Sequence, residues 1–252
     1  MTGGEGADRS CGIIEEQYIT APLSRGGDGI TVYGSDGPVV IRNCTVDLGR
    51  WPLEKLDEGI SGVDGARAVI RRTRVTRVGK AILWGNGDYP DTDPDAELVL
   101  EDCIIRDVGR RAPEAQDGVR VIMRRCVIRN WGIGSRFTVR SFGAWAHDGA
   151  SIRAEDCVFW QDRFLQAGLR GLVADLANWI GWCWQRRDWN LLHWFLPGVC
   201  RGLTASQGGK VSARRCYANH WWIRLQGHQG ARMEKREALA LMALLESRMV
   251  PR

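Results

Sequence analysis

Two segments of the chain, LVLEDCIIRD (residues 98–107) and RVIMRRCVIRN (residues 120–130), share one arrangement of residue types. In each, an apolar stretch is followed by two polar residues, a cysteine and a second apolar stretch. Short apolar and β-branched runs bounded by polar residues are typical of strands. The pattern therefore predicts two short strands joined by a tight turn, with Cys103 and Cys126 at equivalent positions.

The same pattern occurs four more times along the chain. The further copies are VVIRNCTVD (39–47), AVIRRTRVT (68–76), SIRAEDCVFW (151–160) and KVSARRCYANH (210–220). The small residue falls at Cys44, Thr73, Cys103, Cys126, Cys157 and Cys216, at intervals of 29, 30, 23, 31 and 59 residues. Units that repeat in this way predict an all-β fold, a parallel β-helix whose coils stack on one another, whereas a β-sandwich would have a shorter spacing. The last interval holds either two coils or one coil and an insertion.

The repeated cysteines are expected to point inward as small apolar side chains. A disulfide between neighbouring coils is not expected, because adjacent rungs of one ladder meet at the wrong geometry. The eight cysteines also lack a CxxC or a His-paired zinc spacing.

The repeat predicts a single β-helix domain over residues 1–252. Its expected parts are coils over 26–160, a helical insertion over 163–200, a last coil over 210–232 and a C-terminal helix over 233–249. The C-terminal helix would place Leu239, Met242, Leu245 and Met249 on one face and is expected to cover the open last rung. The insertion is rich in tryptophan. A helical pair packed on the β-helix, a lid whose Trp rings stack on sugars, a surface that docks a partner or a membrane, and a homo-oligomer contact all remain open for it.

Composition excludes several classes of protein. The net charge is +5, but acids are interspersed with the basic residues, so nucleic acid is not an expected partner. The chain has no apolar run long enough for a transmembrane span. The first residues, MTGGEGADRSCG, show no signal peptide, which predicts a cytoplasmic protein unless a leader has been removed.

Four segments, in order, resemble the pectate lyases and their relatives in polysaccharide lyase family one. The segments are GGDGITVYGSDGPVVIRNCTVD (26–47), DEGISGVDGARAVIRRTRV (57–75), VGKAILWGNGD (78–88) and DVGRRAPEAQDGVRVIMRRCVIRNWG (107–132). This resemblance implies a right-handed parallel β-helix, binding of an acidic polysaccharide or another anionic ligand, and Ca²⁺ as cofactor.

The resemblance also implies roles for individual residues. Asp28 and Glu58 match calcium ligands, Gly62 stands where a further carboxylate is expected, and Asp57 and Asp64 lie close enough to compensate.

Lys80 matches a lysine that holds a substrate carboxylate, and Arg111 matches the arginine that acts as catalytic base. Gln116 and Glu114 replace two of the family's arginines; Gln116 and Arg110 are kept as candidate substrate contacts.

These residue types suit the elimination of a uronate. Removing a proton next to a carboxylate creates enolate-like charge, which a hard cation and nearby basic side chains stabilise. Asp28 and Glu58 are 30 residues apart, so on stacked coils their backbones would lie about 5 Å apart and could share one Ca²⁺.

Three functions follow as expectations. The first is a pectate lyase-like enzyme that cleaves a uronate-containing polysaccharide by calcium-assisted β-elimination. The others are a β-helix enzyme for an intracellular small molecule and a non-catalytic carbohydrate-binding β-helix. The pair His147-Asp148, His193 and His220 form no triad or metal spacing and are interpreted as packing or surface residues.

Overall fold

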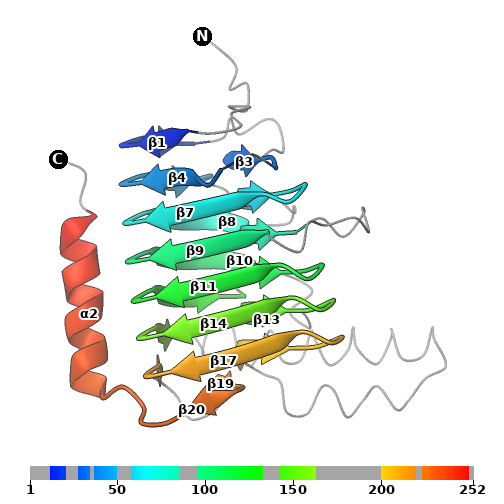
Figure 1. Cartoon of the computed structure of the whole chain (residues 1–252). Helices are drawn as coiled ribbons and strands as arrows, with labels where there is room; N and C mark the ends of the chain where they lie inside the picture. The colour runs from blue at the N-terminus through cyan, green and yellow to red at the C-terminus, as the bar shows by residue number, and fades with distance from the viewer. Residues whose placement is uncertain are drawn as a thin grey trace, which may run out of the picture.

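The chain winds as a parallel β-solenoid, in which each coil adds a strand to each of two sheets (Figure 1). The computed structural model describes residues 12–20, 28–34, 37–49, 58–85, 96–132, 142–162, 200–219 and 223–249. All strand pairs among these residues are parallel, as the sequence repeat predicts.

The two sheets alternate along the chain. The front sheet contains β1 (Ile13–Glu15), β4 (Val39–Arg42), β7 (Arg67–Arg71), β9 (Glu97–Glu101), β11 (Arg120–Arg124), β14 (Ser151–Glu155), β17 (Lys210–Arg214) and β20 (His228–Gln229). The second sheet contains β2 (Tyr18–Ile19), β3 (Ile30–Val32), β5 (Thr45–Asp47), β6 (Glu58–Gly62), β8 (Arg74–Trp84), β10 (Ile104–Ala115), β12 (Val127–Trp131), β13 (Phe142–Ala146), β15 (Val158–Trp160), β16 (Cys200–Ala205), β18 (Tyr217–Ala218) and β19 (Ile223–Leu225).

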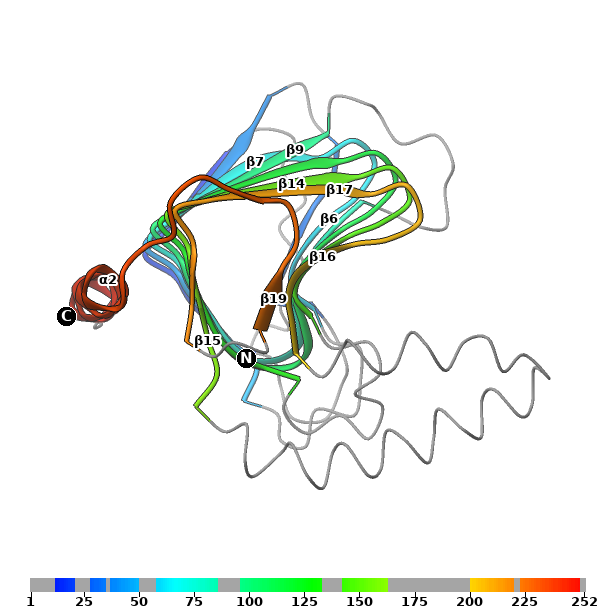
Figure 2. The ribbon, with the colours of Figure 1, turned by 90° about the horizontal axis from the view of Figure 1, so that it is seen from below.

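The second sheet bends, so that the solenoid has three outward faces (Figure 2). The long strand β8 pairs with β5 over Arg74–Thr76 and with β6 over Lys80–Trp84, and β10 spans the same bend. We call the first half of this sheet, with β5, β12 and β15, the helix face. The second half, with β6, β13 and β16, we call the site face.

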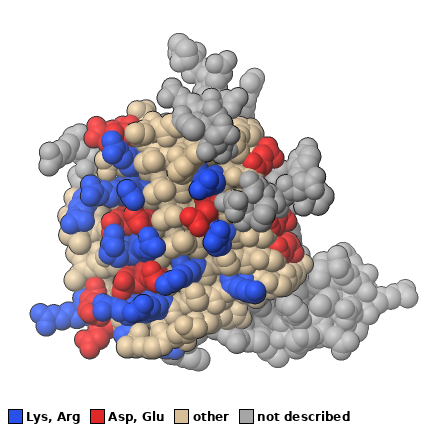
Figure 3. Space-filling model, in the orientation of Figure 1, with Lys and Arg blue, Asp and Glu red and all other residues tan. Residues whose placement is uncertain are grey.

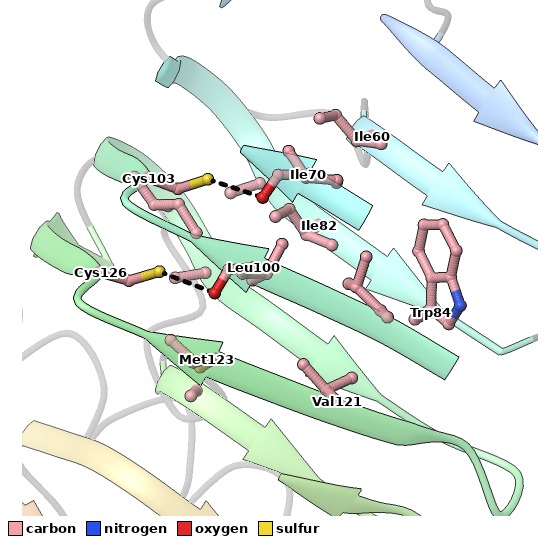
Figure 4. Close-up of a cluster of buried hydrophobic side chains, with 14 of the residues drawn as sticks. Ile60, Ile70, Ile82, Trp84, Leu100, Cys103, Val121, Met123 and Cys126 are labelled. Atoms are coloured by element: carbon pink, nitrogen blue, oxygen red, sulfur yellow. Dashed lines mark hydrogen bonds between the residues drawn. The ribbon is translucent and has the colours of Figure 1, made fainter. Parts of the chain in front are cut away.

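The turn between the front sheet and the helix face explains the repeated cysteines. The residue before each small residue has a left-handed backbone: Asn43, Arg72, Asp102, Arg125, Asp156 and Arg215, with φ between 47° and 55°. The turn directs the next side chain inward, and all five described cysteines of the repeat are buried free thiols. Cys103 Sγ contacts the carbonyl of Ile70 at 3.4 Å, and Cys126 Sγ that of Leu100 at 3.5 Å (Figure 4).

The 59-residue interval holds one coil and an insertion. Val158 pairs with Tyr217 and Ser151 with Lys210, so Cys157 and Cys216 stand on neighbouring rungs. The predicted helical segment 163–200 lies outside the described residues except for Cys200, the first residue of β16.

Helix α2 (Lys235–Arg248) lies along the side of the solenoid, which corrects the expectation that it covers the last rung (Figures 1 and 2). Its buried Leu245 packs with Ile104, Val127 and Val158 of the helix face. These apolar side chains point outward from the sheet, and the apolar side of the amphipathic helix buries them from water. Leu239, predicted for the buried side, is 44% exposed.

The outer surface of the front sheet alternates in charge along the solenoid axis (Figure 3). Arg71, Glu101, Arg124 and Glu155 are successive register partners, and Glu101 binds Arg71 at 2.8 Å and Arg124 at 3.0 Å. Exposed pairs of this kind contribute little stability, but they keep like charges apart on stacked rungs.

No helix among the described residues is long and apolar enough to cross a membrane.

The stacked core makes a direct prediction about stability. Leu100 is fully buried in β9, so Leu100→Ala removes apolar contacts and leaves a cavity between rungs. We expect the free energy of unfolding to fall by about 2–5 kcal/mol, measured by chemical denaturation.

The matched control is Leu244→Ala on α2, where the side chain is 44% exposed. Its unfolding free energy should stay within about 0.5 kcal/mol of the parent protein. Equal losses in the two variants would contradict this description of the core.

Candidate functional site

The site face carries a row of charged side chains on successive rungs. Glu58 pairs in register with Lys80, and Lys80 with Arg111. Asp28 stands two residues before Ile30, which pairs with Ile60, so its position is equivalent to that of Glu58 on the preceding rung. The structure thus brings four of the predicted site residues to one face.

An irregularity in β10 decides which of two neighbouring arginines joins this row. Val78 pairs with Val108 and Lys80 with Arg111, so β10 has one more residue than β8 between these pairs. The additional residue re-aims the strand, as a β-bulge does, and places Arg111 rather than Arg110 beside Lys80.

Glu114 lies at the centre of the charge network. Its carboxylate binds the Arg111 guanidinium, and its Oε2 lies 3.8 Å from Lys80 Nζ. Lys80 Nζ also bonds Glu58 Oε1 at 3.1 Å. The Arg111 guanidinium lies over the Trp145 ring at 4.4 Å, within the range of a cation–π contact.

His147 extends the network toward solvent. Its Nε2 lies 3.1 Å from Glu114 Oε1, and its Nδ1 lies 2.5 Å from Asp148 Oδ2. The imidazole stacks on Trp145 with 3.9 Å between ring centroids, and Trp145 donates to Ser206 Oγ at 2.9 Å. The neighbouring aromatic ring and the two carboxylates fix the orientation of the imidazole.

Burial and mutual contact shift the titration of these groups. Burial raises the pKa of Glu58, and the nearby Lys80 only partly offsets it. Burial also acts to raise the pKa of Glu114, but His147, Arg111 and Lys80 outweigh it and the pKa is lowered. For His147, burial disfavours the cation, yet Glu114 and Asp148 outweigh burial and raise the pKa.

The predicted calcium ligands that the structure describes, Asp28 and Glu58, are both engaged by protein groups. The Asp28 carboxylate accepts from Ser61 Oγ at 2.9 Å and from the Glu58 backbone N–H at 3.2 Å, while Glu58 binds Lys80. No three His, Cys, Asp or Glu side chains in the described part of the chain converge as metal ligands, and Ca²⁺ takes six to eight oxygens. Asp57 lies outside the described residues.

Gly62, where the resemblance implies a further carboxylate, faces the core. A Cβ at this position would lie 2.4 Å from the Trp84 ring. The outward neighbour is Ser61, which binds Asp28, so position 62 in this chain is shaped by packing.

Gln116, a candidate substrate contact, belongs to the turn after β10. Its side-chain amide donates to the Gly85 carbonyl of the preceding rung at 3.0 Å. This bond supports the turn, and Arg110, the other candidate contact, is half-buried.

The sequence interpretation missed His147 and Trp145. Leu83, Glu114, Trp145 and Thr204 are register partners on the site face. Counting along the ladder from Glu114 would have found Trp145, 31 residues later, since the coil length there is 31 residues. His147 lies two residues after Trp145. Its contact with Glu114 joins residues 33 positions apart, so no local motif in the sequence indicates it.

A hollow lies away from the site face. It has a volume of about 550 Å³ and is lined by Arg125, Glu155, Asp156, Arg214, Arg215, Met233, Glu237 and Leu241, beside α2. Three arginines and three carboxylates line it, and Arg215 lies 2.8 Å from Asp156 and 3.5 Å from Glu237, so charges of both signs are mixed there.

Comparisons of the chain with protein families, curated proteins and solved structures found no match. The fold is therefore assigned from the parallel β-solenoid itself, and any function has to be argued from the chemistry of the site face.

The inward orientation of Gly62 can be tested directly. Gly62→Asp adds a carboxylate against the Trp84 ring, so it should overpack the core rather than complete a metal site. We expect a loss of about 3 kcal/mol or more in unfolding free energy, and added Ca²⁺ should not restore the melting temperature.

Ser61→Ala is the control, because it changes the outward neighbour and removes only the hydrogen bonds of Ser61 Oγ to Asp28 and Thr31. It should cost about 1 kcal/mol. A Gly62→Asp protein that Ca²⁺ stabilises strongly would show that position 62 reaches the outer face.

Proposed function

We propose that the chain is a carbohydrate-active protein, a divergent relative of the pectate lyases with their right-handed β-helix, that cleaves a uronate-containing polysaccharide by β-elimination. One observation carries the proposal. Glu58, Lys80 and Arg111, which the sequence resemblance singles out, are register partners on successive rungs of one face.

The two cations suit the charge that develops in the reaction. Abstraction of the proton next to a uronate carboxylate leaves an enolate-like dianion, and preorganised positive groups lower that barrier most when water is excluded. Lys80 and Arg111 are both largely buried, with side chains 13% and 8% exposed. In the proposal Lys80 holds the substrate carboxylate and Arg111 faces the reacting carbon.

Arg111 acts as a base only after it exchanges its partner. Its guanidinium is stabilised as a cation by Glu114 and by the Trp145 ring, and the ordinary pKa of arginine is above 12. Arg111 must therefore leave Glu114 and give its proton to water before the neutral guanidine can take the proton from the substrate carbon, while Lys80 holds the substrate carboxylate. Calcium is implied by the family resemblance alone, and the proposed roles of Lys80 and Arg111 do not depend on it.

A second function, a non-catalytic saccharide-binding module, is favoured by a different observation. Both cations already bind carboxylates, Lys80 that of Glu58 and Arg111 that of Glu114. Such pairing neutralises the face and weakens the case for a reactive cation. The small-molecule alternative depends on a pocket under residues 163–200, of which the structure describes only Cys200.

The lyase proposal predicts ultraviolet-absorbing unsaturated ends when the protein is incubated with polygalacturonate. Lys80→Ala and Arg111→Ala should each lower the initial rate by about 100-fold or more, since the first removes a positive charge aimed at the transition state and the second removes the base. The rates should be measured with Ca²⁺ and with chelator.

Arg67→Ala is the control, because Arg67 is exposed on the front sheet, away from the site face. Its rate should equal that of the parent protein. Binding of oligogalacturonate without any unsaturated product would replace the lyase by the binding module, and neither binding nor product would reject both.

A further inference from the structure

His147 occupies an unusual position between two carboxylates. Nε2 faces Glu114 Oε1 at 3.1 Å and Nδ1 faces Asp148 Oδ2 at 2.5 Å. A neutral imidazole has one N–H donor and one lone pair. Either neutral tautomer would therefore point a lone pair at a carboxylate, and only the imidazolium can donate to both partners.

The two carboxylates differ in their access to water. The side chain of Glu114 is 2% exposed, that of His147 is 8% exposed and that of Asp148 is 45% exposed. His147 thus links a buried carboxylate to one that contacts solvent.

The groups around His147 account for its charge. Glu114 and Arg111 come from β10, Trp145 and Asp148 from β13 and the turn after it, Ser206 from the end of β16, and Lys80 from β8. Trp145 and Ser206 are uncharged, so the two carboxylates are the groups that favour the protonated imidazole. Arg111 and Lys80 lie beside Glu114 and therefore weaken the attraction of Glu114 for the imidazolium.

Glu114 Oε1 is shared between His147 and Arg111, so the state of one affects the other. Glu114 Oε2 is buried and has no hydrogen-bond donor among the described residues. When His147 loses its proton, Arg111 and Lys80 are the cations that remain beside Glu114 in the described part of the chain. They are then held more tightly by the protein and are less available to an anionic ligand.

We propose that His147 is a positioning residue of the site, an imidazolium that holds Glu114 and frees Arg111 and Lys80 for a uronate carboxylate, and that its deprotonation weakens the site as the pH rises. This inference rests on the proposed function for its ligand, but the protonation of His147 can be measured without any ligand.

The sign of the effect on stability follows from the same geometry. The pKa of His147 is raised in the folded protein above its ordinary value of about 6.5. The contribution to stability is therefore complete below about pH 6.5 and is lost as the pH rises through the folded-state pKa.

The first measurement is an NMR titration of the His147 imidazole in the full chain, assigned with His147→Gln. We expect a pKa above the ordinary histidine value. Asp148→Asn should lower it, because one carboxylate partner is lost. Asn also suits the left-handed backbone of position 148, where φ is 50°, so the variant keeps the turn.

Asp64→Asn is the matched control, with a φ of 54° in the equivalent turn of an earlier coil and an exposed side chain. It should leave the His147 titration unchanged. A His147 pKa at or below the ordinary value, or one that Asp148→Asn does not move, would overturn the proposal.

The second measurement is the affinity for trigalacturonate as a function of pH. In the parent protein affinity should fall at least 10-fold as the pH rises through the His147 pKa measured by NMR, and in Asp148→Asn the fall should move to lower pH. A fall that keeps its midpoint in Asp148→Asn would overturn the positioning role. If trigalacturonate binds no form of the protein, the proposed function fails, and the NMR titration alone decides whether His147 is the buried imidazolium.

Discussion

Parallel register between stacked rungs is the constraint on which the rest of the molecule depends. Backbone hydrogen bonds hold each strand directly above the equivalent strand of the next coil, about 4.8 Å away. Any residue type that recurs at one position therefore forms a continuous row. The cysteine row in the core, the alternating charges of the front sheet and the row from Glu58 to Arg111 are three results of this single rule.

Because of the same rule, the residue type at one position of a coil constrains the residue type at the equivalent position of the next coil. Arg71 and Glu101 attract each other because they are register partners, and two arginines at those positions would repel. On the site face the coupling is stronger, because Lys80, Arg111 and Glu114 are largely buried and are screened less by water. A change at one rung there alters the partners available to the next.

The sequence predicted the parts of the fold that repeat. The period located most strands, the inward side chains of Cys103 and Cys126, and the equivalent positions of Asp28 and Glu58 on successive coils. It could not predict which carboxylate each cation would bind, because that depends on side-chain conformation rather than register.

Other features were hidden for different physical reasons. The contact between His147 and Glu114 joins residues 33 positions apart outside the repeated motif. The irregularity between Val108 and Arg111 depends on one additional residue in β10, which sets the register of Arg111 with Lys80. The side position of α2 depends on outward apolar residues such as Val127 that also fit a buried strand.

The two outward faces of the second sheet offer an internal comparison. On the helix face, apolar side chains such as Val158 are buried under Leu245 of α2. On the site face, a carboxylate, a guanidinium and an imidazole are buried side by side, at Glu114, Arg111 and His147. Replacing a buried ion pair by well-packed apolar residues of similar volume is often neutral or stabilising, so burial of charge is weak evidence for a role in stability. On its helix face, the same solenoid buries an outward surface with apolar contacts. The buried charged side chains of the site face therefore point to selection for binding or chemistry.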